Sequence, residues 1–297
     1  MSGFMEWDQK EHAEDYLIYP KNIGYYLSLD ETSLSKGEIY TYLTNKSGKG
    51  KKGTLIASIK GTRSVDIIKT INKIPLEQRK KVKEVTLDMA SNMESAARMS
   101  FPNAMITTDH FHVIRLVMDA LQHVRIKHRW NALEQENKAI KEAKETNKRH
   151  KPIVFKNGDS PKQLLARSRF ILAKREEQWT VNQSNRAIIL FRNYPDIEKA
   201  YRLVIAFRNS YNSSTKAQAH YRFNNWFKEA EELKILEFNT AVNTIRNKIE
   251  TILNYFVSRN TNANAESFNA KIKLFRANLR GVKDTKFFLF RLEKLFA

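Results

Sequence analysis

Cysteine is absent from the 297 residues of this chain. Its absence excludes a disulfide scaffold, a thiol nucleophile and a metal site built on thiolates. The chain also lacks an apolar run of membrane-spanning length, and its charged N-terminus (MSGFMEWDQKEHAEDY) lacks the apolar core of a signal peptide. No P-loop or dinucleotide-binding fingerprint occurs, because Gly48-Lys49-Gly50-Lys51 has the wrong spacing. We therefore expect a soluble, intracellular protein without a membrane partner.

Acidic residues are scarce relative to basic ones. The chain has 52 Lys and Arg against 32 Asp and Glu, which gives a formal net charge of +20. Such a surplus favours a polyanionic partner, and nucleic acid is the first candidate. Hydrophobic residues make up 41% of the chain and aromatic residues 11%, so we expect a globular protein rather than a disordered one.

The early part of the chain contains three runs of β-prone residues, which are Ile23–Leu29, Ile39–Leu43 and Thr54–Ile59. A turn-rich, basic segment over residues 45–53 separates the last two runs, and together they predict an antiparallel meander. Ser64 is a favourable N-cap for a helix that extends to about Ile74. Residues 1–21, which precede the meander, are acidic and dotted with aromatics, and we interpret them as a lead-in.

Two short apolar runs in the stretch 82–112 each end on an aspartate. Val82–Leu87 is followed by Asp88, and Ala104–Thr108 is followed by Asp109. A small-residue helical segment lies between them, so the pattern predicts a β-α-β unit with carboxylates at the carboxyl ends of both strands. In open α/β sheets this edge binds ligands and metals.

The order strand-strand-strand-helix-strand-helix-strand predicts an α/β fold, an RNase H-like mixed five-stranded sheet. From Val113 onward the apolar period becomes helical, and residues 117–258 show no convincing strand. We therefore predict an RNase H-like core over residues 22–116, a large all-α insertion over 117–258, and a return to the core in two C-terminal helices over 259–297.

The penultimate predicted helix carries two stripes. Phe268, Ile272, Phe275 and Leu279 form an apolar stripe, and the polar stripe at the same spacing consists of Glu266, Asn269, Lys273, Arg276 and Arg280. Lys46, Lys49, Lys51 and Lys52 lie on the meander turn. Basic groups beside an acidic site would neutralise phosphates and position a DNA backbone. We therefore predict DNA contacts from Lys49, Lys51, Lys52, Asn269, Lys273, Arg276 and Arg280.

Asp30, Asp88 and Glu266 form the predicted catalytic and metal-binding cluster. Hard oxygen ligands suit Mg²⁺ or Mn²⁺, and two such ions suit phosphoryl transfer on a nucleic-acid backbone. In the predicted sheet, the strand that ends near Asp30 neighbours that of Asp88, while that of Asp109 lies one strand further out. Asp88 therefore ranks above Asp109 as a ligand, and we expect Asp109 to orient a ligand or to be the alternative acid.

Simpler roles remain open for each acid taken alone. An aspartate after a strand is most often a cap or turn residue. Glu266 could be a first-turn glutamate that the helix dipole favours. His110 and His112 flank Phe111, but the sequence shows no third metal ligand beside them, so we expect His112 to have a structural or substrate-orienting role. The order of the three acids, ending on a helix with a basic stripe, favours the functional reading.

With these residues in hand, the chain resembles the DDE transposases of bacterial insertion sequences, specifically the ISL3 type. The resemblance runs from about residue 22 to the C-terminus. The segments that carry it are Ser28-Leu29-Asp30-Glu31-Thr32-Ser33, Lys36-Gly37, Tyr40, Leu87-Asp88-Met89, Phe101-Pro102-Asn103-Ala104, Asp109-His110-Phe111-His112-Val113, Ala200-Tyr201, Trp226, Asn262, Glu266, Asn269, Ile272-Lys273, Arg276 and Gly281.

The resemblance implies an RNase H-like core, metal-dependent cleavage and joining of DNA strands, and a triad of Asp30, Asp88 or Asp109, and Glu266. Family members usually carry an N-terminal zinc-binding and helix-turn-helix region, and only about 20 residues precede the first strand predicted here. End recognition would then come from elsewhere, such as a companion DNA-end-binding protein, or this copy is degenerate. We also expect a homo-oligomer in the active complex. The alternatives are a nuclease that cleaves without joining and a catalytically inactive DNA-binding remnant.

Overall fold

The computed structural model describes residues 2–35 and 37–297. The chain divides into two compact units. One unit runs to Val113 and resumes over Lys248–Ala297, and the other comprises Ile114–Asn247. Residues 248–258, which the predicted insertion included, thus belong with the sheet-bearing unit by their contacts. The domain limits stay a prediction.

One mixed sheet organises the first unit, and it has six strands in the described residues, in the order β1-β4-β3-β2-β5-β6. Strands β1, β4, β3 and β2 are successively antiparallel, whereas β2, β5 and β6 are parallel to one another. The strands are β1 (Tyr16–Ile18), β2 (Tyr26–Ser35), β3 (Glu38–Asn45), β4 (Leu55–Lys60), β5 (Glu84–Leu87) and β6 (Met105–Thr108).

The prediction of five strands was wrong by one. The additional strand, β1, lies in the lead-in and pairs with the edge of β4. Its three residues are too few to show a β period, so the sequence pattern did not reveal it. Strand β2 is also longer than expected, because it continues through Asp30 to Ser35.

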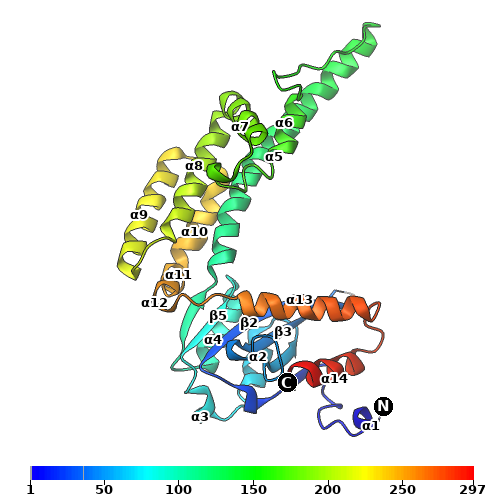
Figure 1. Ribbon diagram of the computed structural model, residues 1–297, viewed down its shortest axis with the longest axis vertical. Coiled ribbons are helices and arrows are strands. Elements are labelled where there is room, and N and C mark those ends of the chain that lie inside the picture. The colour runs from blue at the N-terminus through cyan, green and yellow to red at the C-terminus, as the bar shows by residue number, and fades with distance from the viewer. Residues whose placement is uncertain (1, 36) are drawn as a thin grey trace. The chain divides into compact units, whose positions relative to one another are not determined.

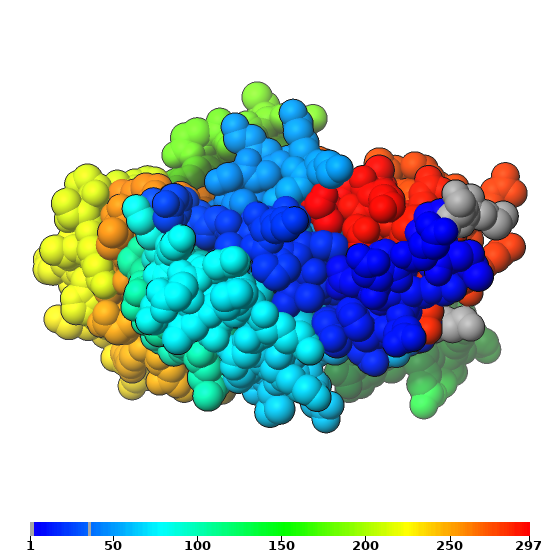
Figure 2. Space-filling view, turned by 90° about the horizontal axis from the view of Figure 1, so that it is seen from below, coloured from blue at the N-terminus to red at the C-terminus, as the bar shows by residue number. Residues whose placement is uncertain are grey.

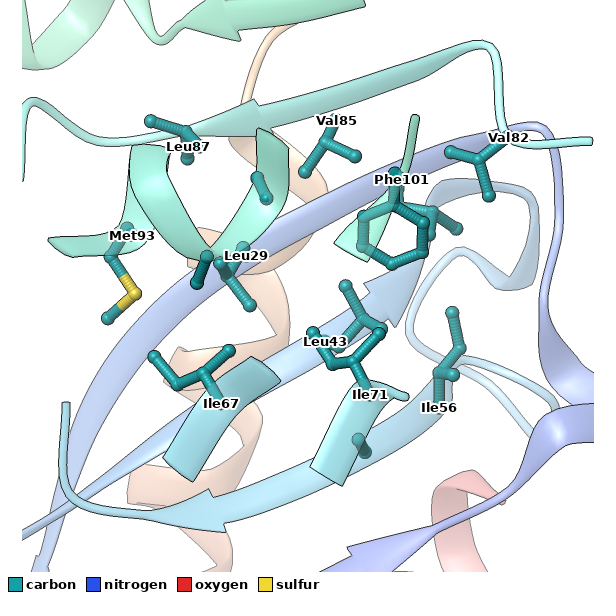
Figure 3. Close-up of a cluster of buried hydrophobic side chains, with 14 of the residues drawn as sticks. Leu29, Leu43, Ile56, Ile67, Ile71, Val82, Val85, Leu87, Met93 and Phe101 are labelled. Atoms are coloured by element: carbon teal, nitrogen blue, oxygen red, sulfur yellow. The ribbon is translucent and has the colours of Figure 1, made fainter. Parts of the chain in front are cut away.

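One face of the sheet is covered by α2 (Ser64–Ile71) and α4 (Ser91–Ser100). Figure 3 shows the apolar core between these layers, where Leu29 and Val85 project from the strands toward Ile67 and Met93 of the helices. Alternation along β2 sends the side chains on either side of Leu29 to the opposite face. Asp30 therefore lies on the face away from α2 and α4.

The opposite face packs against α13 (Ala263–Asn278) and α14 (Thr285–Phe296). Phe268 and Ile272 of α13 are buried there, which confirms the predicted apolar stripe at these two positions. Figure 2 shows the N-terminal residues (dark blue) lying against the C-terminal ones (red). In that contact Trp7 is buried and its indole N–H donates to Glu293 over 2.5 Å.

The remaining helical segments of the first unit are short. They are α1 (Ser2–Met5), η1 (Pro20–Asn22), η2 (Lys46–Gly48), α3 (Leu76–Arg79), α11 (Ile249–Leu253) and α12 (Tyr255–Ser258). Thr251 of α11 shares a 2.7 Å hydrogen bond with Thr108, and Asn254 donates to the carbonyl of Ile106. These bonds hold the chain that leads into α13 against the β6 edge of the sheet.

The regular structure of the second unit is helical throughout its described residues (Figure 1). Helix α8 packs between α7 and α9, and its core includes Phe207 and Trp226. The elements are α5 (His110–Glu145), which begins in the first unit, α6 (Pro161–Arg167), η3 (Glu176–Gln178), α7 (Val181–Asn193), α8 (Pro195–Ser210), α9 (Lys216–Leu233), η4 (Leu236–Phe238) and α10 (Asn239–Asn247).

Candidate metal centre and nucleic-acid interface

Three aspartates occupy equivalent positions on the three parallel strands. Leu29 of β2 pairs with Leu87 of β5, and Leu87 pairs in turn with Thr108 of β6. The residue that follows each of these partners is an aspartate: Asp30, Asp88 and Asp109. Since adjacent strands lie about 4.8 Å apart, the register puts the three aspartates in one row at one edge of the sheet, with Asp88 in the middle.

Asp30 is the most perturbed acid of this row. Only 9% of its surface is exposed, and its carboxylate accepts hydrogen bonds from the backbone N–H of Glu31 and from Nδ2 of Asn269, both over 2.8 Å. Burial raises the pKa of Asp30 to about 6, and the charge of Asp88 adds to this effect. The backbone bond and the charge of His112 act in the opposite direction. A buried acid beside other acids is a group that a bound cation would stabilise in its charged form.

Asp88 is half-buried in the turn that precedes α4. One of its carboxylate oxygens accepts the N–H of Ala90 over 2.8 Å, a turn role of the kind that the sequence left open. Its charge raises the pKa of both Asp30 and Glu31, for which burial is the largest cause. Asp88 therefore orders its own turn, and its charge acts on Asp30 and Glu31.

Asp109, His112 and Glu266 form the cluster with metal-ligand spacing. One ligand atom from each lies within 4.8 Å of the other two. This separation is only slightly wider than the about 4.2 Å between opposite ligands of an octahedral ion with 2.1 Å bonds. The sequence showed no third ligand beside the histidines, but α13 brings Glu266 to His112 from more than 150 residues away, roughly the length of the helical unit.

Burial and hydrogen bonding shift the pKa of Asp109 in opposite directions. Its side chain is 1% exposed, which acts to raise the pKa. Hydrogen bonds from His110 and from the backbone N–H of Asn262, together with the charges of His110 and His112, lower the pKa below its usual value despite that burial. Oδ2 of Asp109 is buried and has no hydrogen-bond partner among the described residues. It is therefore an oxygen ligand that is open to a cation.

Helix α13 carries both Glu266 and the group that orients Asp30. Glu266 lies in its exposed first turn, and its N–H donates to the carbonyl of Asn262. Asn269 lies one turn further along, is buried, and reaches Asp30. Of the polar stripe predicted for this helix, Glu266 and Asn269 thus lie near the aspartates, while Phe268 and Ile272 anchor the helix in the core.

The residues predicted to contact DNA have different surroundings. Lys49, Lys51, Lys52, Lys273 and Arg280 are exposed. Arg276 is partly buried and donates to the carbonyl of Leu34 over 2.6 Å, so it also closes the end of β2. Asn269 is engaged with Asp30. Lys36 of the resemblance motif lies outside the described residues.

Two groups in this region have surroundings that the sequence did not predict. Lys46 belongs to the basic meander turn, yet it is only 8% exposed and its ammonium donates to the hydroxyl of Thr86. Asn262, whose side chain is fully buried, holds Asp109 through its backbone N–H over 3.2 Å. Asn262 was already among the residues that carry the family resemblance, and the asparagine-rich run before α13 was a second signal for it.

The residues fit divalent ions by their chemistry. Four carboxylates and one imidazole meet at one edge of the sheet, and hard oxygen ligands of this kind suit Mg²⁺ and Mn²⁺. The open Oδ2 of Asp109 and the raised pKa of Asp30 are the two observations that a cation would resolve. The predicted ranking of Asp88 above Asp109 stays a prediction, because Asp88 lies beside Asp30 and Asp109 lies beside Glu266.

Comparison with known proteins identifies the family. The sequence model of the ISL3-type DDE transposases, described as "Transposase", matches residues 27–292. The transposase for insertion sequence element IS1001 of Bordetella parapertussis is 22% identical over 274 residues, which cover 91% of this chain and 61% of that protein. This chain thus spans about three-fifths of that relative's length. No solved structure matches it.

In the described part of the chain, no helix is long and apolar enough to cross a membrane. The match to the family model extends over most of the chain and includes the three aspartates and Glu266. The chain therefore belongs to the ISL3 family of DDE transposases.

Proposed function

We propose that this protein cleaves DNA at the ends of an insertion sequence and transfers the freed strand to target DNA, on an RNase H-like core. The observation that carries the proposal is the row of Asp30, Asp88 and Asp109 on three parallel strands, which α13 completes with Glu266. The strand order β3-β2-β5-β6, with one antiparallel and two parallel pairings, supports the RNase H-like assignment.

Asp30, Asp88 and Glu266 would hold two divalent ions, with Asp109 and His112 completing or orienting the ligand set. Bound there, the ions would lower the pKa of the attacking water or hydroxyl and offset the charge on the leaving oxygen. Asn269 fixes one carboxylate oxygen of Asp30, and Asn262 fixes one of Asp109. The chain's own contribution is thus a set of acids held in place before substrate arrives.

The exposed basic residues would hold the DNA backbone beside these acids. Lys273 lies on the same helix as Glu266, and Lys49, Lys51 and Lys52 lie on the meander turn. Arg280, which was predicted on that helix, lies in the turn just after its end at Asn278 and has a φ of 54°. Lys271 of α13 donates to the carbonyl of Gly50 over 2.7 Å, so the turn and the helix are tied together. Exposed basic residues on the turn and on this helix support phosphate contacts that are salt-dependent and weakly sequence-selective.

A strand-transfer assay with Mg²⁺ or Mn²⁺ tests the proposal. The substrate is a labelled duplex that ends in the element's terminal sequence, with supercoiled plasmid as the target. Joined products support a transposase, nicked products alone support a nuclease, and neither product from a folded protein that binds DNA supports an inactive remnant. Glu266→Gln should abolish both products, whereas the control Glu77→Gln, an exposed acid on α3, should leave both unchanged.

A further inference from the structure

A cavity of about 300 Å³ opens beside the acidic site, in the same unit of the chain. We call it the Tyr26 pocket, and its lining residues are Tyr26, Lys46, Ser47, Arg259, Asn260, Thr261 and Asn264. They come from the start of β2, from the meander turn and from the segment that leads into α13. None of the described residues that line it is acidic. The catalytic role proposed above does not use this cavity.

Two cations give the Tyr26 pocket its charge. Lys46 lines the pocket and is only 8% exposed, and its ammonium donates to the hydroxyl of Thr86. The charges of Glu84 and Asp109 act on this ammonium, and Glu84 also accepts a 2.7 Å hydrogen bond from Asn260. Arg259 supplies the second cation, and its guanidinium lies over the rings of Tyr255 and Phe256, at 5.4 Å and 4.9 Å from their centroids. A cavity with this charge suits an anion.

The other lining groups suit a nucleotide better than a bare anion. The ring of Tyr26 is 38% exposed and offers a stacking surface, and stacking on aromatic side chains is the usual way in which proteins hold an unpaired base. The side chains of Asn264 and Thr261 add hydrogen-bonding groups of both kinds at the rim. A volume of about 300 Å³ lies at the lower end of the range for small-molecule pockets.

The position of the pocket relates it to the acidic site. Asn262 lies between two lining residues, Asn260 and Asn264, and its backbone N–H is the group that holds Asp109. Tyr26 and Asp30 are four residues apart on β2, which corresponds to about 13 Å along the strand. A DNA strand with its reacting phosphate at the acids therefore has a neighbouring nucleotide within reach of the pocket.

We propose that the Tyr26 pocket binds one unpaired nucleotide of the DNA strand near the cleavage point, with its phosphate on Lys46 and Arg259 and its base on the ring of Tyr26. This inference rests on the proposed function, because it takes the DNA strand to pass through the acidic site. The pocket would bind a single position of the DNA strand, whereas the exposed lysines would contact backbone phosphates at any position.

Photocrosslinking of the full chain tests the pocket. The probe is a duplex with a single-stranded 3′ overhang that carries 5-iodo-deoxyuridine at successive positions, with Ca²⁺ in place of Mg²⁺ to prevent cleavage. We expect a crosslink to Tyr26, mapped by mass spectrometry, from one or two adjacent positions only. Crosslinking to Tyr26 from every position equally, or from none, would overturn the proposal, as would competition for it by free thymidine monophosphate at the same concentration as the DNA.

Variants separate the pocket from general DNA binding. Tyr26→Ala should weaken binding of the overhang probe about tenfold and leave binding of a blunt duplex unchanged, whereas Tyr26→Phe, which keeps the ring, should bind like wild type. Arg259→Gln should behave like Tyr26→Ala. The matched control is Tyr25→Ala, which removes a neighbouring ring that is 55% exposed and lies outside the pocket. Unchanged thermal melting of each variant would show that it folds.

The two proposals fail in different ways. If wild type cleaves DNA with Mg²⁺ while Tyr26→Ala binds the overhang probe like wild type, the pocket proposal is wrong and the proposed function stands. If wild type binds DNA but Glu266→Gln cleaves it as well as wild type does, the function proposed for the acidic site is wrong, whatever the pocket binds.

Discussion

Asn269 of α13 donates a 2.8 Å hydrogen bond from Nδ2 to Oδ2 of Asp30 on β2, across 239 residues of sequence. This bond fixes the position of the first acid relative to the helix that carries Glu266. The other side-chain atom of Asn269, Oδ1, is buried without a hydrogen-bond partner among the described residues. The amide thus serves Asp30 and has one acceptor left unused.

Removing this bond should weaken the metal site without removing a ligand. We expect Asn269→Ala to lower cleavage and Mn²⁺ affinity by about 10- to 100-fold, the usual cost of losing a group that orients a ligand. DNA binding in the absence of metal should change little. The control is Asn278→Ala, an exposed asparagine at the end of the same helix. Equal Mn²⁺ affinity of the two variants in calorimetric titrations would contradict the role given to Asn269.

Asp30→Asn should stabilise the metal-free protein at neutral pH. The pKa of Asp30 is raised from 3.8 to about 6 in the folded state, so the folded state binds more protons than the unfolded state between these values. The contribution of protonated Asp30 to the stability of wild type is fully present below about pH 4 and is lost as the pH rises through 6. A pKa shift of about two units corresponds to at most about 3 kcal/mol in the free energy of unfolding. If the amide of Asn269 turns by 180°, its unused Oδ1 can accept a hydrogen bond from the new amide. Urea unfolding at several pH values measures the difference.

The same variant should respond differently to metal. Mn²⁺ should raise the melting temperature of wild type, because a ligand that binds only the folded state stabilises it. It should raise that of Asp30→Asn much less. A variant that is less stable than wild type at pH 7.5 without metal, or that gains as much from Mn²⁺, would refute this account of Asp30.

Asp88 and Asp109 can be ranked by substitution. We expect Asp88→Asn to abolish cleavage and Asp109→Asn to reduce it by about 10- to 100-fold, since Asp109 is the more buried and is held by Asn262 and His110 as an orienting group would be. In the absence of metal, both variants should bind DNA nearly as wild type does. Full activity in Asp88→Asn together with none in Asp109→Asn would reverse the ranking.

Lys273 and Arg276 should fail in different ways. Lys273 is exposed, so Lys273→Ala should weaken DNA binding and reduce the slope of log affinity against log salt by about one, with an unchanged melting temperature. Arg276 donates to the carbonyl of Leu34, so Arg276→Ala should also lower the melting temperature by a few degrees. Lys81→Ala, at an exposed lysine outside α13, is the control. An unchanged salt slope in Lys273→Ala would mean that this lysine only faces solvent.

The sequence pattern predicted the strands that carry the acids because their apolar runs are short, strongly β-prone and punctuated by aspartates. The aspartate row followed from parallel strands ending at one edge. The pattern could not predict which side chains from distant parts of the sequence lie next to each other. Strand order alone put Asp109 far from the other ligands, but helix α13 brings Glu266 to Asp109 and His112, a contact that no local period encodes.

The sequence also could not predict which polar side chains are buried. Lys46 and Lys49 both lie in the same basic, turn-rich segment of the sequence. Lys46 is nevertheless buried against Thr86, whereas Lys49 is exposed. Which lysine turns inward depends on the backbone of the turn, where Lys49 adopts a left-handed conformation with a φ of 51°. In the same way, β1 exists because the edge of β4 accepts it, and its own three residues give no such signal.

Counting bound Mn²⁺ by electron paramagnetic resonance tests the central claim most directly. The claim is that Asp30, Asp88 and Glu266, supported by Asp109 and His112, form a centre for two divalent ions. Wild type in the presence of DNA should bind two Mn²⁺ per chain, and the double variant Asp30→Asn, Glu266→Gln should bind none at the same concentration. Two ions bound by the double variant as tightly as by wild type would contradict the claim.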